Sequence, residues 1–295
     1  SKIIETPNID YIAENGVLFS NCAVTNSICG PSRAVALTGK YSHINGFKDN
    51  RSKFNGNQQT FPKLLQKVGY HTMMVGKWHL GHAQQTYHPN SRGFEHFYGH
   101  LHTEVGFFPP FASLGGRDFQ RNGVSIDDQG YESYLLADEV SRYILERDTE
   151  KPFFIYMPFI APHTPLDAPD ELKAKYADMG DDRGKSRSER ADQTRFMAKI
   201  TGRESARPMY AAVVDGMDQS IGKVLDTLDA EGLADNTIVL FFSDNGGAVY
   251  ATGGADNAPL RGGKGDTFEG GIRVVAAMRW PEKIVAGGQV NSIMS

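Results

Sequence analysis

The side chains in this sequence that could do covalent chemistry begin with Cys29, which lies in the run Cys29–Arg33 (CGPSR). Pro31 suits the first turn of a helix and Gly39 suits its end, so this spacing predicts a short helix that starts beside the thiol. Free backbone N–H groups and the positive end of the helix dipole would then face an anion held near Cys29. Arg33 falls in the first turn, where its guanidinium can hydrogen-bond a nucleophile or an oxyanion. A small buried hydrophobe is the alternative interpretation of a lone cysteine.

Other reactive side chains directly follow apolar stretches that are typical of strands. Lys77 and His79 come after residues 70–75, and His163 comes after residues 152–159. In open α/β sheets, ligands bind outside the carboxyl ends of the strands, so this placement predicts one functional edge. The alternatives are a surface pair for Lys77 and His79, and an ordinary structural histidine at His163. The prolines on either side of His163 favour a rigid frame that aims the imidazole.

A third stretch of this kind, residues 238–242, leads into Asp244 and Asn245. A carboxylate beside an amide oxygen suits a hard cation such as calcium or magnesium. An Asx turn that ends a strand is the alternative. Lys264 lies in a glycine-rich loop, but Gly265 stands where a nucleotide-binding P-loop needs Ser or Thr. The sequence therefore favours Lys264 as a point charge aimed at a tetrahedral anion, with a solvated turn lysine as the alternative.

The spacing of apolar residues predicts alternating helices and strands around these side chains. The expected helices span residues 7–16, 31–39, 61–68, 131–146 and 209–228, and the expected strands span 17–24, 70–75, 152–159 and 238–242. Strands that are apolar on both faces and separated by helices predict an α/β fold with a mostly parallel central sheet and helices on both faces. Residues 178–195 are mostly charged and lack an apolar period, which indicates a solvated loop or a flexible insertion on the substrate side.

Composition excludes several classes of function. The 295 residues carry a net charge of −4, which gives no electrostatic footprint for nucleic acid. No apolar run reaches the roughly 18 residues of a membrane span, and the first residues do not form a signal-peptide pattern. Cys22 and Cys29 are the only cysteines. A bridge between them would consume the thiol at the predicted helix start, so we expect a fold without disulfides.

These motifs, in this order, resemble the type I sulfatase family of the alkaline phosphatase superfamily over essentially the whole chain. The matching stretches are 6–10, 29–39, 76–81, 161–165, 215–228, 243–247 and 260–273. The resemblance implies a sulfatase-like α/β fold and a sulfuric ester hydrolase, similar to arylsulfatases, that acts on sulfate monoesters of a sulfated carbohydrate or an aryl alcohol. It also implies that a formylglycine-generating enzyme oxidises Cys29 to formylglycine, and that Asp244, Asn245 and residue 29 bind calcium.

The resemblance further implies a role for each remaining polar side chain. Arg33 and Lys77 would stabilise the hydrate of formylglycine, and His79 would act as the base in sulfate release. His163 and Lys264 would contact the sulfate or the leaving oxygen. A periplasmic, secreted or lysosomal location is also implied by the family.

The resemblance points to one subgroup of the family at a single stretch, and it lacks family segments at both ends of the chain. Residues 257–264 look similar to those of N-acetylgalactosamine-4-sulfatase relatives, and residues 100–111 and the charged segment 178–195 are candidates for substrate specificity. The family's N-terminal strand ending in Asp-Asp and its smaller C-terminal subdomain have no counterpart here. We therefore expect residues 1–295 to be a sulfatase catalytic domain that is incomplete at both ends. The alternatives are an inactive anion- or glycan-binding module, and a phosphomonoesterase or phosphodiesterase on the same fold.

Overall fold

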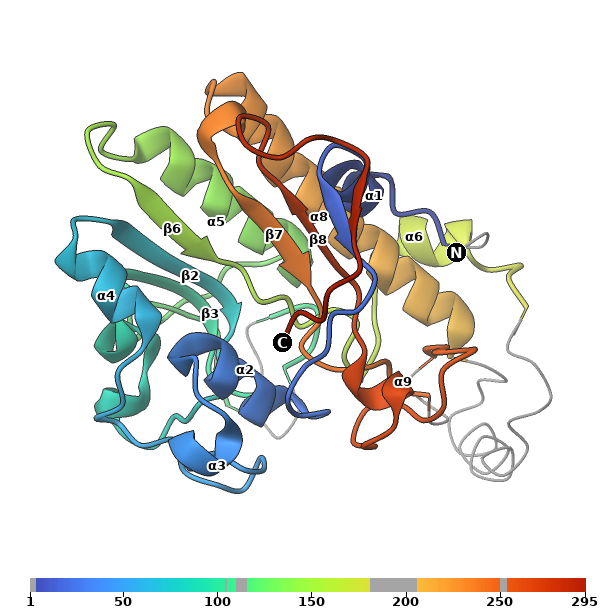
Figure 1. Cartoon of the computed structure of the whole chain (residues 1–295), viewed down its shortest axis with the longest axis horizontal. Helices are drawn as coiled ribbons and strands as arrows, with labels where there is room; N and C mark the ends of the chain where they lie inside the picture. Colours follow the sequence, from blue (N-terminus) through green and yellow to red (C-terminus); the bar gives the residue numbers. More distant parts are fainter. Residues whose placement is uncertain (1–3, 104, 110–115, 181–205, 250–253) are drawn as a thin grey trace. The chain divides into compact units, whose positions relative to one another are not determined.

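The structure is a computed structural model that describes residues 4–103, 105–109, 116–180, 206–249 and 254–295 (Figure 1). Its contacts divide the chain into two compact units. The first unit comprises Ser1–Ser27, Ala161–Gln219 and Ile238–Ser295, and the second comprises Ile28–Ile160 and Ser220–Thr237.

The second unit contains a five-stranded sheet with the order β5-β4-β3-β2-β6. Its strands are β2 (His71–Lys77), β3 (His96–His100), β4 (Gln120–Arg121), β5 (Val124–Ser125) and β6 (Phe153–Tyr156). β2 pairs in parallel with both β3 and β6, whereas β4 pairs antiparallel with β3 and β5. A tight turn at Asn122 and Gly123, both with positive φ, joins β4 to β5. Six of the seven residues of β2 are buried, so both faces of this strand are covered.

Helices flank this sheet (Figure 1). They are α2 (Cys29–Thr38), α3 (Ser42–Asn45), α4 (Phe61–Lys67) and α5 (Glu132–Glu146), with 3-10 turns at Gln85–Tyr87, Pro89–Arg92 and Ala234–Asn236. Leu37 of α2 packs in one apolar cluster with Met74 of β2 and with the buried ring of Trp78. Glycines end several of these elements; Gly39, for example, closes α2 in the left-handed conformation that favours glycine. Because α2 begins at Cys29, the predicted helix start beside this residue is also confirmed.

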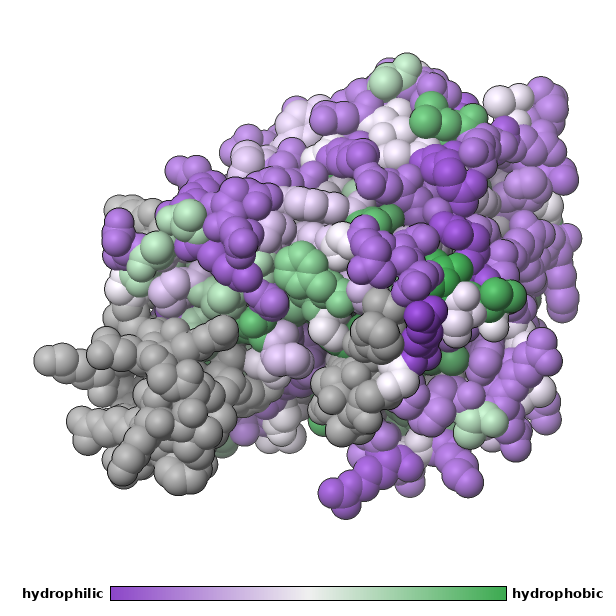
Figure 2. All heavy atoms as spheres, turned by 180° about the vertical axis from the view of Figure 1, so that it is seen from behind, coloured by the Kyte–Doolittle hydropathy of each residue, from purple (hydrophilic) through white to green (hydrophobic). Residues whose placement is uncertain are grey.

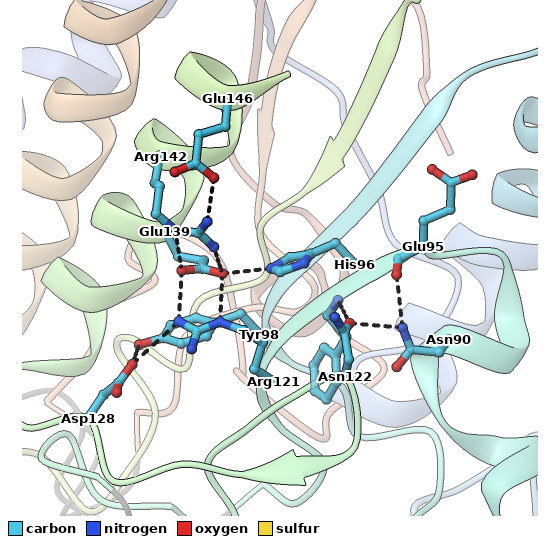
Figure 3. A network of polar contacts seen from close by, with 11 residues as sticks. Asn90, Glu95, His96, Tyr98, Arg121, Asn122, Asp128, Glu139, Arg142 and Glu146 are labelled. Atoms are coloured by element: carbon cyan, nitrogen blue, oxygen red, sulfur yellow. Dashed lines mark hydrogen bonds and ion pairs between the residues drawn. The ribbon is translucent and has the colours of Figure 1, made fainter. Parts of the chain in front are cut away.

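A buried carboxylate attaches α5 to the sheet (Figure 3). Glu139 is 4% exposed and accepts a hydrogen bond from His96 Nε2 at 2.6 Å. The guanidinium groups of Arg121 and Arg142 each donate two more hydrogen bonds to the same carboxylate. Burial opposes ionisation of Glu139, but these hydrogen bonds outweigh burial and hold its pKa well below the usual 4.5. The carboxylate therefore stays charged and joins β3, β4 and α5.

The first unit contains a four-stranded sheet with the order β7-β8-β1-β9. Its strands are β1 (Val17–Phe19), β7 (Val239–Phe242), β8 (Ala276–Arg279) and β9 (Gly288–Val290). Its helices are α1 (Pro7–Glu14), α6 (Asp170–Lys175), α9 (Glu269–Ile272) and residues 207–219 of α8 (Arg207–Ala230); the rest of α8 belongs to the second unit. Asp218, on α8, caps α1 by accepting the backbone N–H groups of Asn8 and Ile9 at 3.1 and 2.8 Å.

The expected α/β class is confirmed, and the pairing of the strands differs in detail from a single, mostly parallel sheet. Short antiparallel pairs, such as β4 with β5 and β7 with β8, accompany the parallel set β6-β2-β3. The strand expected at 17–24 ends at Phe19, after which only isolated bridges at Cys22 and Ala23 continue the pairing. The strand expected to be buried at 238–242 exposes every second residue of β7, and because alternate side chains point to opposite faces, one face of β7 is less covered than the other.

Two further expectations concern the surface. Within the described residues, no helix is long and apolar enough to span a membrane. Figure 2 shows a face of the molecule that is mainly hydrophilic, with hydrophobic residues in small groups. Of the charged segment 178–195, residues 181–195 lie outside the described residues, so its predicted role stays a prediction.

Candidate active site

Cys29 is the first residue of α2 and is 2% exposed. Cys22 and Cys29 are both free thiols, as expected. The N-cap residue, Ile28, has no side chain that could cap the helix. Instead, Asn50 accepts the Gly30 N–H at 3.1 Å with its Oδ1, and its Nδ2 lies 3.6 Å from Cys29 Sγ as a donor. No motif in the sequence surrounds Asn50.

Two buried cations lie beside this helix start. Arg33 is 6% exposed and Lys77 is 2% exposed, so the alternative of a solvated surface pair at the end of β2 is wrong for Lys77. Arg33 Nη1 donates to the carbonyl oxygen of Lys77 at 2.9 Å, which fixes the guanidinium against the end of β2. Positive charge near the start of a helix adds to the positive end of the helix dipole. This part of the second unit is therefore suited to hold an anion.

The backbones of β2 and β3 lie very close together where β2 ends. Gly76 pairs with Gly99, and a Cβ at Gly99 would lie 2.2 Å from the Gly76 oxygen. Beyond this point, Trp78 N–H donates to the His100 oxygen at 2.9 Å. His79 then adopts a φ of 61°, which is uncommon for a residue other than glycine. Such backbone strain tends to be kept at functional sites, where the surrounding structure enforces it.

A buried acid–base pair adjoins Lys77. His100 is the register partner of Lys77, and its Nε2 lies 3.6 Å from Oε1 of Glu132; both side chains are fully buried. His100 Nδ1 lies 2.7 Å from the His102 oxygen, and because a carbonyl can only accept, Nδ1 carries the proton. The sequence predicts His100 as a structural histidine at the start of the candidate specificity segment 100–111. The sequence does not predict a buried role for Glu132, because a glutamate at a helix start is usually exposed to solvent.

In the first unit, Asp244 and Asn245 follow the end of β7. Asn245 Nδ2 donates to the Gly246 oxygen at 2.9 Å, which fixes the orientation of the amide. The other amide atom, Oδ1, is buried and has no hydrogen-bond partner among the described residues. A buried acceptor without a donor is costly, and an oxygen in this position suits a hard cation. The Asn245 oxygen therefore fits the predicted calcium site, and the role of Asp244 there stays a prediction.

Glycine-rich loops hold Lys264 near the same strand end. Lys264 N–H donates to the Gly247 oxygen at 3.0 Å, so the lysine segment lies against the Asp244–Gly247 turn. Asn257 ties the two together, because its Nδ2 donates to the oxygens of Gly247 and Gly262 and its Oδ1 accepts the Gly247 N–H. Close backbone packing explains the glycines: a Cβ at Gly263 would lie 2.5 Å from the Gly247 oxygen.

His163 lies in the first unit, after the segment that continues from β6, and is half-buried. Its Nδ1 lies 2.5 Å from the Thr164 oxygen. Since the carbonyl can only accept, Nδ1 carries the proton, and Nε2 is the nitrogen that can exchange a proton with a ligand.

The predicted site residues thus fall into two sets. The second unit brings together Cys29, Arg33 and Lys77, with His79 two residues after Lys77. The first unit holds Asp244, Asn245 and Lys264 on joined loops, and His163 on its own segment. Among the residues that the structure describes, no three His, Cys, Asp or Glu side chains gather as a metal site.

A protein-family model described as Sulfatase matches residues 1–295. The chain belongs to the sulfatase family. The N-acetylglucosamine-6-O-sulfatase of Bacteroides thetaiotaomicron is 31% identical to this sulfatase chain over an alignment that covers 99% of it and 61% of the relative. Human N-acetylgalactosamine-6-sulfatase is also 31% identical, with 98% of this chain and 55% of the relative covered. The sulfatase chain therefore spans somewhat more than half the length of these two relatives.

Solved structures agree with the family. The crystal structure of Ps i-CgsB in complex with k-i-k-neocarrahexaose matches with a TM-score of 0.82 and 32% identity, covering 100% of this chain and 64% of that one. A structure in complex with D-glucosamine-2-N,6-O-disulfate matches with a TM-score of 0.74 and 30% identity, covering 99% and 69%. These matches confirm the sulfatase-like α/β fold. The similarity of residues 257–264 to N-acetylgalactosamine-4-sulfatases stays a prediction.

Proposed function

We propose that this chain carries the catalytic centre of a sulfuric ester hydrolase that cleaves sulfate monoesters of a sulfated carbohydrate or an aryl alcohol. The observation that carries the proposal is Cys29, buried at the first residue of a ten-residue helix with the buried cations Arg33 and Lys77 joined at its side. Relatives that are sulfatases by name support the reaction. The relative bound to a disulfated glucosamine supports a sugar substrate.

The nucleophile of this proposal is formylglycine, formed when a formylglycine-generating enzyme oxidises Cys29. When hydrated, its aldehyde supplies a hydroxyl that can attack sulfur and a second hydroxyl that allows sulfate to leave. The chain's own residues prepare this position. The start of α2 offers N–H groups and a positive dipole end to an anion. The family resemblance supports a periplasmic, secreted or lysosomal location.

Charge neutralisation is the main task of the remaining residues. Arg33, Lys77 and Lys264 would each face negative charge on the sulfuryl oxygens, and such preorganised charges commonly account for a large share of rate enhancement. Asp244 and Asn245 would hold calcium together with residue 29, and the cation would supply Lewis-acid polarisation of the sulfate. The buried, unpartnered Oδ1 of Asn245 supports this assignment.

Two histidines would move protons. Nδ1–H of His163 donates to the Thr164 oxygen, so the doubly protonated imidazolium would carry its second proton on Nε2 and would donate that proton to the departing alcohol, with Lys264 as the alternative acid. His79 would accept a proton from the nucleophile when sulfate leaves. Its strained backbone, with φ of 61°, supports a role that requires a fixed direction for the imidazole.

Mass spectrometry of the peptide that contains residue 29, followed by turnover assays with an aryl sulfate, a 6-sulfated amino sugar and an aryl phosphate, tests the proposal. We expect formylglycine at residue 29 and hydrolysis of a sulfate ester. Cys29→Ala should lower kcat by at least about a thousandfold, since it removes the covalent step. Cys22→Ala is the matched control, because Cys22 is also a buried free thiol, and it should retain turnover.

Each contrary outcome has a distinct meaning. Sulfate hydrolysis that survives in Cys29→Ala would overturn the role of Cys29. Hydrolysis of the phosphate ester alone would favour a phosphatase on this fold. Calorimetric binding of a sulfated sugar by modified protein that shows no turnover would favour a binding module.

A further inference from the structure

Asn50 contacts the nucleophile position with both ends of its side-chain amide. Its Oδ1 accepts the Gly30 N–H at 3.1 Å, and its Nδ2 donates to Cys29 Sγ at 3.6 Å. The residue lies in the segment that follows α3, 21 positions after Cys29 in the sequence. One side chain therefore contacts both the reacting atom and the backbone that carries it.

The oxygen of Asn50 acts as a helix cap supplied from outside the helix. The first N–H groups of α2 have no partner within the helix, and Ile28 at the N-cap cannot accept one through its side chain. Asn50 Oδ1 takes this place at Gly30, the second residue of the helix. Reversing the amide would set an NH2 group against the Gly30 N–H, so the amide has one favourable orientation. In that orientation the NH2 group faces residue 29.

Local structure holds the Asn50 side chain in place. Asp49 forms a turn in which its Oδ1 accepts the N–H groups of Arg51 and Ser52 at 2.9 and 2.8 Å. The Ser52 hydroxyl donates to the same oxygen, and these hydrogen bonds lower the pKa of Asp49, the Ser52 side chain first. The carboxylate is therefore ionised at neutral pH and keeps the turn closed around Asn50.

The glycine after Cys29 makes room for this contact. A Cβ at Gly30 would lie 2.7 Å from Asn50 Oδ1 and 2.7 Å from a ring carbon of Phe47. Any larger residue at position 30 would displace Asn50 from the helix start or push against the Phe47 ring. The Cys-Gly pair and Asn50 are thus parts of one arrangement.

We propose that Asn50 is a further catalytic residue, which donates a hydrogen bond to the side chain at position 29 and orients it for attack. The inference rests on the proposed function. When residue 29 carries oxygen in place of sulfur, the donor meets a stronger acceptor, because sulfur is a weak one. Removing a single donor of this kind from an active site typically lowers kcat by about a hundredfold to a thousandfold.

Asn50→Asp is the decisive variant. It keeps an oxygen for the Gly30 N–H, removes the donor, and adds a negative charge beside residue 29. We expect kcat for an aryl sulfate to fall at least about a hundredfold, with KM within about threefold and a melting temperature near that of the parent. Asn57→Asp is the matched control, because Asn57 is an exposed asparagine seven residues further on, and it should leave all three values unchanged.

Two further measurements separate a chemical role from a structural one. Asn50→Ala should lose kcat in the same way and should also melt at a lower temperature, because it removes the cap as well. The fraction of formylglycine at residue 29, read by mass spectrometry, should be equal in all variants. A kcat in Asn50→Asp equal to that of Asn57→Asp, at equal formylglycine content, would overturn the inference.

A readout without turnover distinguishes this failure from failure of the proposed function. In protein labelled with ¹⁵N-asparagine, the side-chain amide signal of Asn50 should shift in Cys29→Ala, whereas that of Asn57 should not. If the parent hydrolyses no sulfate ester, the proposed function fails, and this signal still decides whether Asn50 donates to residue 29. An Asn50 signal that is identical in the parent and in Cys29→Ala would overturn the contact itself.

Discussion

The amide oxygen of Asn245 is a buried acceptor that has no donor among the described residues, although the other end of the same amide is bonded to Gly246. A buried polar atom left in this way costs about 1–3 kcal/mol, which a bound cation would recover. The energetic role of this residue should therefore depend on whether metal is present.

Calcium removal tests this dependence. We expect a chelator to lower the melting temperature of the parent, and calcium to restore it. Asn245→Ala should lose most of this calcium effect while its metal-free form stays within about 1 kcal/mol of the metal-free parent, because the lost oxygen was unsatisfied. Thermal unfolding with and without calcium measures both values. Asp235→Ala, an exposed carboxylate in the 3-10 turn before β7, is the control, and equal calcium effects in it and in Asn245→Ala would return Asn245 to a turn role.

Side-chain chemistry in the site could be predicted where a motif surrounds the residue, and not elsewhere. Cys29 and Arg33 share one short run, and Lys77 follows an apolar stretch, so their types and spacing were informative. Asn50 and Asn257 reach their partners through turns that bring separate segments together. A single asparagine in a loop is usually a turn residue, so the sequence predicts neither contact, although Asn257 begins the stretch 257–264 that resembles sulfatase relatives.

At the scale of secondary structure, α5 is held by one carboxylate that serves three basic side chains (Figure 3). Glu139→Gln keeps the shape but removes the charge that His96, Arg121 and Arg142 share. We expect the free energy of unfolding to fall by about 3 kcal/mol, at the lower end of the range for breaking a buried ion pair, because Arg121 and Arg142 are partly exposed. Urea unfolding measures it, and Glu146→Gln on the same helix, whose carboxylate is 62% exposed, should change it by less than about 1 kcal/mol.

The parent and Glu139→Gln should also differ in how their free energy of unfolding changes with pH. The folded-state pKa of Glu139 lies below its usual 4.5, so its contribution to stability is fully present above that value and is lost as pH falls towards the folded-state pKa. The difference in stability between the parent and Glu139→Gln should thus be largest above about pH 5 and should shrink below about pH 4.5. A difference that stays constant between pH 7 and pH 3.5 would show that packing, and not charge, carries the effect.

Helices were easier to predict than strands in this chain. α1, α4, α5 and α8 carry an apolar period and clear end signals, and their observed bounds differ from the expected ones by a few residues. β3 was missed because its sequence, His96–His100, mixes two histidines with glycine and lacks an apolar pattern. β2 and β4 pair with β3 on its two sides, and such pairing over distance leaves no local signal.

At the scale of the whole molecule, contacts between distant parts of the chain complete each unit. In the first unit, β1 pairs with β8 and β9, which lie more than 250 residues later in the chain. Asp218 joins α8 to α1 across 210 residues. The α/β class could be predicted from local pattern, but these pairings could not, because register and direction depend on residues that are distant in sequence.

Asp218→Asn tests the long-range cap. The new amide can accept from Ile9 N–H with its one oxygen, but its NH2 group faces two donors of Asn8. We expect a loss of about 1–2 kcal/mol in unfolding free energy, as for removal of a helix N-cap. Hydrogen exchange at the Asn8 and Ile9 amides should accelerate as well. Asp226→Asn, at an exposed position on the same helix, is the control, and equal exchange rates in both variants would exclude the capping role.

The close backbone packing around the end of β2 has a consequence for how this chain can evolve. Gly76 and Gly99 each admit glycine only, because a Cβ at Gly99 would lie 2.2 Å from the Gly76 oxygen and a Cβ at Gly76 would lie 2.3 Å from the Pro158 oxygen. Such positions tolerate no drift, although neither carries a reactive group. Conservation of a residue at this strand end would therefore indicate close backbone contact as strongly as it indicates a chemical role. We expect Gly76 to be as conserved as Lys77, although Gly76 has no side chain that could contact the substrate.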